Sequence, residues 1–414
     1  MAGRLELLVD EQSIWIRHEV RRSERWAAWA TALAVFGSVL FAACSAAAGP
    51  RAAGRLVYVA DTKRDEISQF RASRSPHGAL KPLARSTVRA GPFPYTIAVD
   101  PQGTSAYATS SASKVYQYTI NPTTGRLTPK SPATVATKSG GTAAIAFTPD
   151  GTSAYIVGKN ISQYSIDATT GDLTPKSPAT VATPPNPEPI AVSANGKYAY
   201  VANCGGCGYA LQKTPSHAAA GAAAVKRHHA KPSYLVEYRI KPRTGALSPK
   251  PIAKMTTGNG ANWIAIAPNG KSVYVATSTH GVWQYTINPT TGRLSPKNPE
   301  TTGGTEHNIV IAPNGKNAYV IGATRRGVSQ YRINPRTGTL SPKPMSTADT
   351  VLHPEALALS ADGKNAYATS ENDPEIAQYT INPTTGKITA MTPATVKTAS
   401  GALGLAVTPI PSAK

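Results

Sequence analysis

A phrase that occurs seven times constrains this chain more than any other feature. Each copy holds a short apolar segment marked by a tyrosine, followed by a segment in which Gln or Glu precedes an aromatic residue. The marker tyrosines are 45 to 49 residues apart, except for one step of 74. They are Tyr58, Tyr107, Tyr155, Tyr200, Tyr274, Tyr319 and Tyr367. A period in the forties, built from short β segments and Gly/Pro turns, is typical of a β-propeller with one repeat per blade.

Each repeat divides into four segments, which predicts a blade of four antiparallel strands. The first segment, as in residues 96–100, alternates large and small apolar side chains and suits an inner strand packed between neighbouring blades. The fourth contains a proline such as Pro129, which suits an outer edge strand. Pairs such as Asn195-Gly196 and the Asn-Pro-x-Thr-Gly phrases predict tight turns on one face of the disc. The connections on the other face vary between copies, and binding residues favour variable loops.

The C-terminal segment predicts how the ring closes. Residues 403–409 have the pattern of an inner strand with no blade after it, and Leu56-Val57-Tyr58 opens the first blade with no inner strand before it. The last strand should therefore complete blade one and remove the open edges. We expect an all-β, seven-bladed propeller over residues 56–414.

Residues 1–49 have the pattern of an export signal, and residues 50–55 of a linker. Four arginines precede an uncharged, Ala-rich run from Trp26 to Ala48. Residues 40–44 resemble a lipoprotein lipobox, in which Cys44 would be lipidated. Cleavage after Cys44 and an uncleaved anchor are the alternatives, because the run is long enough to span a bilayer; residues 1–19 also fit an over-extended start. We expect an exported protein, either a membrane-associated lipoprotein or secreted to the cell surface.

The chain carries a formal net charge of +21, and none of the excess lies in residues 1–44. Lysines of the Leu-[Thr/Ser]-Pro-Lys phrase should form a positive belt around the rim: Lys130, Lys176, Lys250, Lys297 and Lys343. Such a belt favours solubility or attraction to anionic polymers and lipid head groups. We expect no nucleic-acid partner, because no basic groove interleaved with aromatic residues is visible.

The long step between repeats contains an insertion at 204–233, between the second and third strands of blade four. Its Ala-rich, basic composition predicts a mobile loop. Cys204 and Cys207 form a Cys-x-x-Cys at its root, for which a local disulfide is expected in an exported protein. Metal binding with histidines of the loop is the alternative, although the spacing matches no standard zinc pattern.

The repeat motifs resemble those of a known family. Tyr200-Val201-Ala202-Asn203, the Pro-x-Gly-Lys turns and the Asn-Pro-x-Thr-Gly hairpins resemble the YVTN-type propellers. They are also similar to the wider lactonase-like seven-bladed family, which includes propeller-type 6-phosphogluconolactonases, over residues 56–414. Lactonase relatives typically carry Pro-Arg-His at the start of an inner strand. Here His307 and Asn308 take the places of the arginine and the histidine, and no blade has the Arg-His pair.

One position per blade, eight residues before the first turn glycine, should ring the mouth of the central channel on the variable face. It holds Tyr95, Ala143, Glu188, Asn262, His307 and Glu355, with Leu403 from the closing strand. His307 with Glu188, Glu306 or Glu355 could provide general-base hydrolysis of a lactone or ester, or hold a divalent metal. Tyr95, Asn262, Trp263, Asn308 and His353 are the candidate ligand-binding residues. Solvated polar groups in a wet channel are the alternative.

We therefore expect a non-catalytic binding or surface-interaction scaffold, with a lactone hydrolase as the alternative. The chain has no phosphate-binding glycine loop, nucleophile elbow or His-Glu-x-x-His motif. The expected partner is a small molecule, a cell-envelope polymer or a protein on the variable face, with a membrane contact through the N-terminus. We expect a monomer without cofactor or bound metal.

Overall fold

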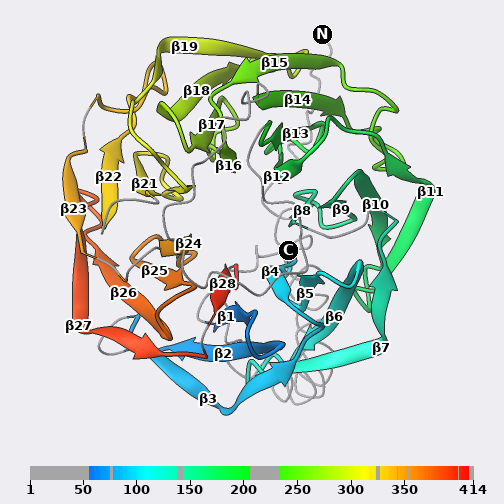
Figure 1. Cartoon of the computed structure of the whole chain (residues 1–414), viewed down its shortest axis with the longest axis vertical. Helices are drawn as coiled ribbons and strands as arrows, with labels where there is room; N and C mark the ends of the chain where they lie inside the picture. The colour runs from blue at the N-terminus through cyan, green and yellow to red at the C-terminus, as the bar shows by residue number, and fades with distance from the viewer. Residues whose placement is uncertain are drawn as a thin grey trace, which may run out of the picture. The chain divides into compact units, whose positions relative to one another are not determined.

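The computed structural model describes residues 56–74, 78–138, 143–205, 233–322, 327–342, 344–349, 351, 354–399 and 401–409. The chain divides into two units, Met1–Arg51 and Ala52–Lys414, and all described residues belong to the second. Their strands form seven four-stranded antiparallel sheets around a centre (Figure 1). The predicted all-β, seven-bladed propeller is confirmed.

Each blade runs from an inner to an outer strand. Blade one contains β28 (Ala402–Val407), β1 (Leu56–Asp61), β2 (Glu66–Ala72) and β3 (Leu80–Arg89). Blade two contains β4 (Pro94–Val99), β5 (Ser105–Ser110), β6 (Lys114–Ile120) and β7 (Leu127–Ala136). Blade three contains β8 (Ala144–Phe147), β9 (Ser153–Val157), β10 (Ile161–Ile166) and β11 (Leu173–Val181). Blade four contains β12 (Pro187–Val192), β13 (Tyr198–Asn203), β14 (Ser233–Arg239) and β15 (Ala253–Thr257).

The last three blades follow the same order. Blade five contains β16 (Ala261–Ile266), β17 (Ser272–Thr277), β18 (Gly281–Ile287) and β19 (Leu294–Thr301). Blade six contains β20 (Asn308–Ile311), β21 (Asn317–Ile321), β22 (Val328–Arg332) and β23 (Ser346–Ala348). Blade seven contains β24 (Pro354–Leu359), β25 (Asn365–Ser370), β26 (Glu375–Ile381) and β27 (Ile388–Lys397).

The C-terminal strand closes the ring in the predicted way. β28 pairs antiparallel with β1, placing Val57 opposite Val407 and Val59 opposite Leu405, and the two strands lie side by side in Figure 1. Beyond the strand, the amide of Thr408 donates to the carbonyl of Leu56 at 3.0 Å. Blade one is thus built from both ends of the domain, so that the ring has no unpaired seam.

The repeated tyrosines join each blade to the next one. Each is buried, and its hydroxyl donates to the carbonyl of a turn glycine in the next blade at 2.5–2.9 Å. The pairs are Tyr58–Gly125, Tyr107–Gly171, Tyr155–Gly245, Tyr200–Gly292, Tyr274–Gly338, Tyr319–Gly386 and Tyr367–Gly78. A buried tyrosine needs such a partner, so the bonds explain why the tyrosine and the turn glycine recur together. We call these seven bonds the Tyr–Gly clasps.

The repeated glutamines form a second link between blades. Gln117 accepts from the amide of Leu173 in the next blade at 2.8 Å and donates to the carbonyl of Pro132 in its own blade at 3.1 Å. Gln163 makes the same two bonds, to Leu247 and Pro178. The Gln-Tyr pair of the third strand and the Leu of the turn phrase are therefore parts of one inter-blade contact.

The lysines of the rim correct the expectation of a free positive belt. Lys130, Lys176 and Lys297 donate to turn carbonyls of the next blade, those of Thr170, Thr244 and Thr337. Burial lowers the pKa of Lys176 and Lys297. Lys250 is exposed, and Lys343 lies outside the described residues. The recurring lysine thus serves blade packing, since the turn of the next blade presents a carbonyl to it.

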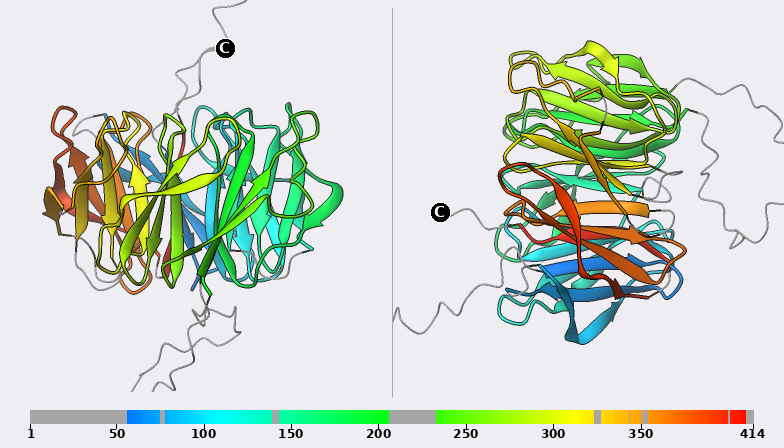
Figure 2. Two further views of the ribbon diagram at one scale, coloured as in Figure 1. Left: turned by 90° about the horizontal axis from the view of Figure 1, so that it is seen from above. Right: turned by 90° about the vertical axis from the view of Figure 1, so that its left-hand side faces the viewer.

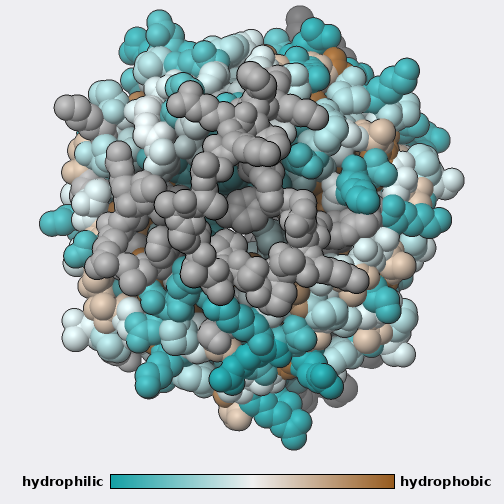
Figure 3. All heavy atoms as spheres, viewed as in Figure 1, coloured by the Kyte–Doolittle hydropathy of each residue, from teal (hydrophilic) through white to brown (hydrophobic). Residues whose placement is uncertain are grey.

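The two faces of the disc carry different connections. Because all pairings are antiparallel, the turns from first to second strand and from third to fourth strand share one edge of every blade. We call this the regular-turn face, and the opposite side the variable-loop face. Figure 2 shows the strands running through the thickness of the disc between these faces. The periphery of the described surface in Figure 3 is mostly hydrophilic, as expected for solvated blade edges.

Candidate functional site

The ring of predicted site residues lies where the inner strands begin. Tyr95, Glu188, Asn262 and Glu355 are the second residues of β4, β12, β16 and β24, and His307 directly precedes β20. Neighbouring inner strands contact one another around the centre, in the order β4, β8, β12, β16, β20, β24 and β28. One inner strand, β16, therefore separates Glu188 from His307.

His307 and Glu355 are brought together across the boundary between blades six and seven. The Nε2 atom of His307 lies 3.6 Å from Oε2 of Glu355, and both side chains are 28% exposed. The Nδ1 atom lies 3.2 Å from the backbone carbonyl oxygen of the same glutamate. Both ring nitrogens thus face oxygen acceptors of one residue, which holds the imidazole in a fixed orientation.

Asn262 links blades five and six at the same level. Its Nδ2 atom donates to Oγ of Ser278 at 3.0 Å and to the backbone carbonyl of Glu306 at 3.3 Å. The amide of Glu306 in turn donates to the carbonyl of Thr277 at 2.8 Å. The Glu306 side chain is only 2% exposed, so its carboxyl group is not presented to solvent. The sequence did not indicate Ser278 or Thr277, because neither belongs to an inner strand.

Asn308 is fully buried at the start of β20. Within the described ranges, neither its Oδ1 nor its Nδ2 atom has a hydrogen-bond partner. A buried amide without partners costs about 1–3 kcal/mol of stability. Asn308 therefore destabilises the folded protein relative to an apolar residue of the same size. Such groups in a native structure call for a functional reason or a bound molecule.

Glu188 is half-buried, and burial raises its pKa to about 7. Its carboxyl group therefore exchanges a proton near neutral pH, as acid–base groups in active sites do. Structural carboxyls also behave in this way when they are buried.

Below its mouth, the central channel is lined mainly by apolar side chains. A cavity of about 410 Å³ is lined by side chains of four inner strands, among them Trp263, Val310, Ile311, Leu359 and Leu405. Trp263 is 36% exposed and is one of few large apolar side chains open to solvent in the described ranges. An exposed indole beside polar groups suits the apolar face of a ring-shaped ligand.

The predicted disulfide between Cys204 and Cys207 is tested only in part. Cys204 is buried, directly follows β13 and is disulfide-bonded. Its partner lies outside the described residues, so pairing with Cys207 stays a prediction. His353, Cys44 and most of the insertion at 204–233 also lie outside them.

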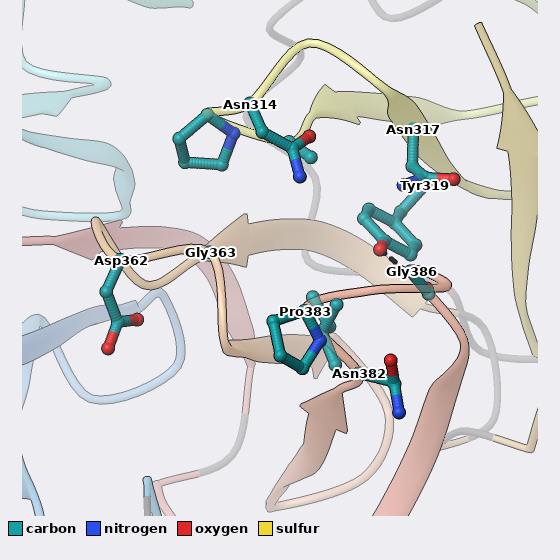
Figure 4. A pocket seen from close by; sticks show the side chains of 11 residues that line it. Asn314, Asn317, Tyr319, Asp362, Gly363, Asn382, Pro383 and Gly386 are labelled. Carbon is teal, nitrogen blue, oxygen red and sulfur yellow. Dashed lines mark hydrogen bonds between the residues drawn. The ribbon is translucent and has the colours of Figure 1, made fainter.

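A second small cavity, of about 60 Å³, lies on the regular-turn face between blades six and seven. Turn residues such as Asn314, Asp362 and Asn382 line it, and Figure 4 shows the Tyr319 hydroxyl bonded to Gly386 within it. Because a Tyr–Gly clasp fills its base, we interpret it as a crevice of blade packing.

In the part of the chain that is described, no group of three His, Cys, Asp or Glu side chains could hold a metal ion. That part also contains no helix with the length and apolar character needed to cross a membrane.

The comparisons with known proteins agree with this architecture. Residues 47–157 match the family model described as lactonase, 7-bladed beta-propeller. The predicted resemblance to lactonase-like propellers is confirmed. No curated protein matches this chain.

Solved structures show the same fold at low sequence identity. A Bacteroides uniformis protein proposed to be a 6-phosphogluconolactonase is 18% identical, with a TM-score of 0.63, over 85% of this chain and 98% of its own. The periplasmic gluconolactonase of Pseudomonas aeruginosa is 14% identical, with a TM-score of 0.62, over 86% and 99%. A protein of unknown function from Desulfotomaculum acetoxidans is 17% identical, with a TM-score of 0.64, over 86% and 99%. At identities this low, the structural similarity establishes a shared fold and not a shared function.

Proposed function

We propose that this lactonase-like propeller binds a small polar ligand at the channel mouth of blades five to seven and does not hydrolyse it. The contacts of His307 with Glu355 are the observation on which the proposal depends. A general base needs a ring nitrogen directed at the substrate or its attacking water. Both nitrogens of His307 are instead directed at Glu355, at 3.6 and 3.2 Å.

The surrounding residues favour a sugar acid or sugar lactone as the ligand. Trp263 offers an exposed indole face, and Asn262 lies next to it at the start of β16. The buried amide of Asn308 could gain a partner from a ligand or an ordered water, which would remove its desolvation cost. The names of two structural neighbours, which refer to gluconolactone chemistry, make sugar acids the first class to test.

Isothermal titration with gluconate tests this proposal. We expect saturable binding to the full chain, with loss of binding in Trp263→Ala. Trp283→Phe is the matched control, because Trp283 packs in the cluster of buried residues between blades four and five. Absence of binding, or equal binding by both variants, would refute the proposed site.

Lactone hydrolysis is the second candidate, favoured by the family match and by Glu188. A carboxyl group with a pKa near 7 can accept a proton at neutral pH. If Glu188 is the base, lactone opening should rise with pH through about 7 and vanish in Glu188→Gln. If the rate of lactone opening is the same in Glu188→Gln and in the wild type, Glu188 is not the base.

We also propose, from the N-terminal sequence, that the protein is exported and lipidated at Cys44. The export pattern in residues 1–49 supports this proposal. Metabolic labelling with a radioactive fatty acid should mark the wild-type protein and leave Cys44→Ala unlabelled. Labelling of both proteins would argue against the lipobox.

A further inference from the structure

The turns of blades four to seven place unbalanced positive charge on the regular-turn face. Nine exposed cations lie in or directly beside these turns: Lys197, Lys241, Arg243, Lys271, Arg293, Lys316, Arg336, Lys364 and Lys387. The same turns contain one acidic residue, Asp362. The equivalent turns of blades two and three contain Asp150, Asp167 and Asp172 but only one cation, Arg126. Blades two and three therefore lack this excess, and the described part of the equivalent turn of blade one adds one exposed cation, Arg74.

Four of these lysines occupy the same position of consecutive blades. The side-chain oxygens of Asn195, Asn269 and Asn314 accept from the backbone amides of Lys197, Lys271 and Lys316 at 2.9–3.1 Å. Asp362 does the same for Lys364 at 3.1 Å. The turns are held rigidly, and their side chains point to solvent. The lysines thus form an inner arc around the channel, and the cations of the outer turns, such as Arg243 and Arg293, form a second.

We propose that this double arc, Lys197 to Lys387, binds a linear acidic polysaccharide. Like charges along one arc repel one another, and a chain with regularly spaced carboxylates relieves that repulsion along the whole arc. Exposed threonines of the same turns, such as Thr290 and Thr384, add hydroxyls that can bond to sugar hydroxyls. This site is separate from the channel mouth, since the inner strands begin on the opposite face.

The same face lacks what other polyanions or membranes would use. The exposed large apolar side chains of the described residues are Phe93, Trp263 and Met345, and none of them belongs to these turns. Peripheral binding to a bilayer usually buries such side chains. Single-stranded nucleic acid stacks its bases on aromatic side chains, which the described turns of blades four to seven do not contain. Charge and hydroxyl groups alone fit an acidic polysaccharide.

Binding of the full chain to polygalacturonate tests the proposal. We expect affinity that falls steeply with salt, and no binding to neutral dextran. The combined variant Lys197→Thr, Lys271→Thr, Lys316→Thr and Lys364→Thr should bind at least about tenfold more weakly. Threonine is the natural residue at this position in blades two and three, Thr104 and Thr152, so the turns should keep their structure. A variant with arginine at the four positions should retain affinity.

The matched control removes the same charge elsewhere: Lys114→Thr, Lys138→Thr, Lys159→Thr and Lys397→Thr, all exposed and near connections of the variable-loop face. The control should bind like the wild type. Equal weakening of both variants would reduce the effect to net charge and overturn the proposal. Stronger binding to single-stranded DNA or to anionic vesicles through the same four lysines would also overturn it, as would no binding at low salt.

Discussion

At the scale of single residues, the departures from the repeat are the most informative positions. Glu237 stands where the other six blades carry a glutamine that bonds to the next blade, five of them by accepting from a leucine amide and Gln330 by donating to the carbonyl of Thr385. Its Oε1 still accepts from the amide of Leu294 at 2.8 Å, but within the described ranges Oε2 has no hydrogen-bond partner. Burial raises the pKa of this carboxyl group. Blade four therefore holds, in place of an amide, an acid whose protonated form is stabilised by folding.

Replacing Glu237 by Gln should stabilise the protein at pH 8 and have little effect at pH 4. The folded state favours the protonated acid, so stability is full at low pH and is lost as pH rises above the usual carboxyl pKa. Free energies of unfolding from urea titrations at the two pH values measure the difference. The converse variant, Gln117→Glu, should destabilise blade two at pH 8 by about 1–3 kcal/mol, since Gln117 Nε2 is a donor to Pro132. At pH 8 the unfolding free energy should rise in Glu237→Gln and fall in Gln117→Glu; changes of the same sign would contradict this interpretation.

Asn308→Leu should separate stability from function. Leucine has a similar size and removes a buried amide without partners in the described residues, so we expect a gain of about 1 kcal/mol. Gluconate affinity should fall in the same variant. If stability decreases and binding persists, the amide is bonded in solution and has no role in the ligand site.

At the scale of strands and turns, the sequence predicted most of the architecture. Alternating apolar residues, turn glycines and the tyrosine period identified the blades and the closing strand, because these patterns record local burial. The roles of Lys130 and Lys176 could not be predicted, since their acceptors are carbonyls of the next blade. The equal sequence position of Glu188 and His307 predicted a common ring but not the direction in which each side chain points.

The Tyr–Gly clasps should each contribute to the packing between blades. Tyr200→Phe leaves the carbonyl of Gly292 without its donor, and we expect a loss of about 0.5–1.5 kcal/mol. Tyr116→Phe is the control, because Tyr116 is half-buried and makes no clasp. Thermal unfolding of both variants measures the contrast. Equal effects would mean that the clasp hydrogen bond adds nothing beyond ring packing.

The closing strand approaches blade two more closely than a side chain allows. A Cβ atom at Gly404 would lie 2.6 Å from Cα of Thr96 and 3.0 Å from the carbonyl oxygen of Tyr95. Gly404→Ala should therefore push β28 away from β4 and cost about 1–3 kcal/mol. Hydrogen exchange of the β28 amides should become faster in this variant. Unchanged exchange would show that the seam tolerates the extra methyl group.

At the scale of the whole molecule, Asp61 and Glu188 add to the dependence of stability on pH that Glu237 introduces. Burial raises the pKa of Asp61, beside the closing strand, and of Glu188 to about 7 each. The unfolded chain releases these protons near pH 4. Unfolding free energy should therefore fall as pH rises from about 4 to 7 and then level off with respect to these groups. Urea titrations across this range should show a shallower fall in Asp61→Asn; an unchanged slope would argue against a buried acid at the seam.

The whole molecule also separates two proposed sites by face. The channel mouth offers a small site with one engaged imidazole and one exposed indole, on the side where the inner strands begin. The opposite face offers an extended cationic arc. A seven-bladed propeller can hold either role, since function follows the site and not the fold.

The rate at which glucono-δ-lactone opens in the presence of the full chain distinguishes binding from catalysis. Because Nδ1 of His307 lies 3.2 Å from the Glu355 carbonyl oxygen and Nε2 faces the Glu355 carboxylate at 3.6 Å, we predict the uncatalysed rate, with gluconate bound in a parallel titration. Multiple turnovers above that rate, lost in His307→Gln, would show that this site catalyses the reaction.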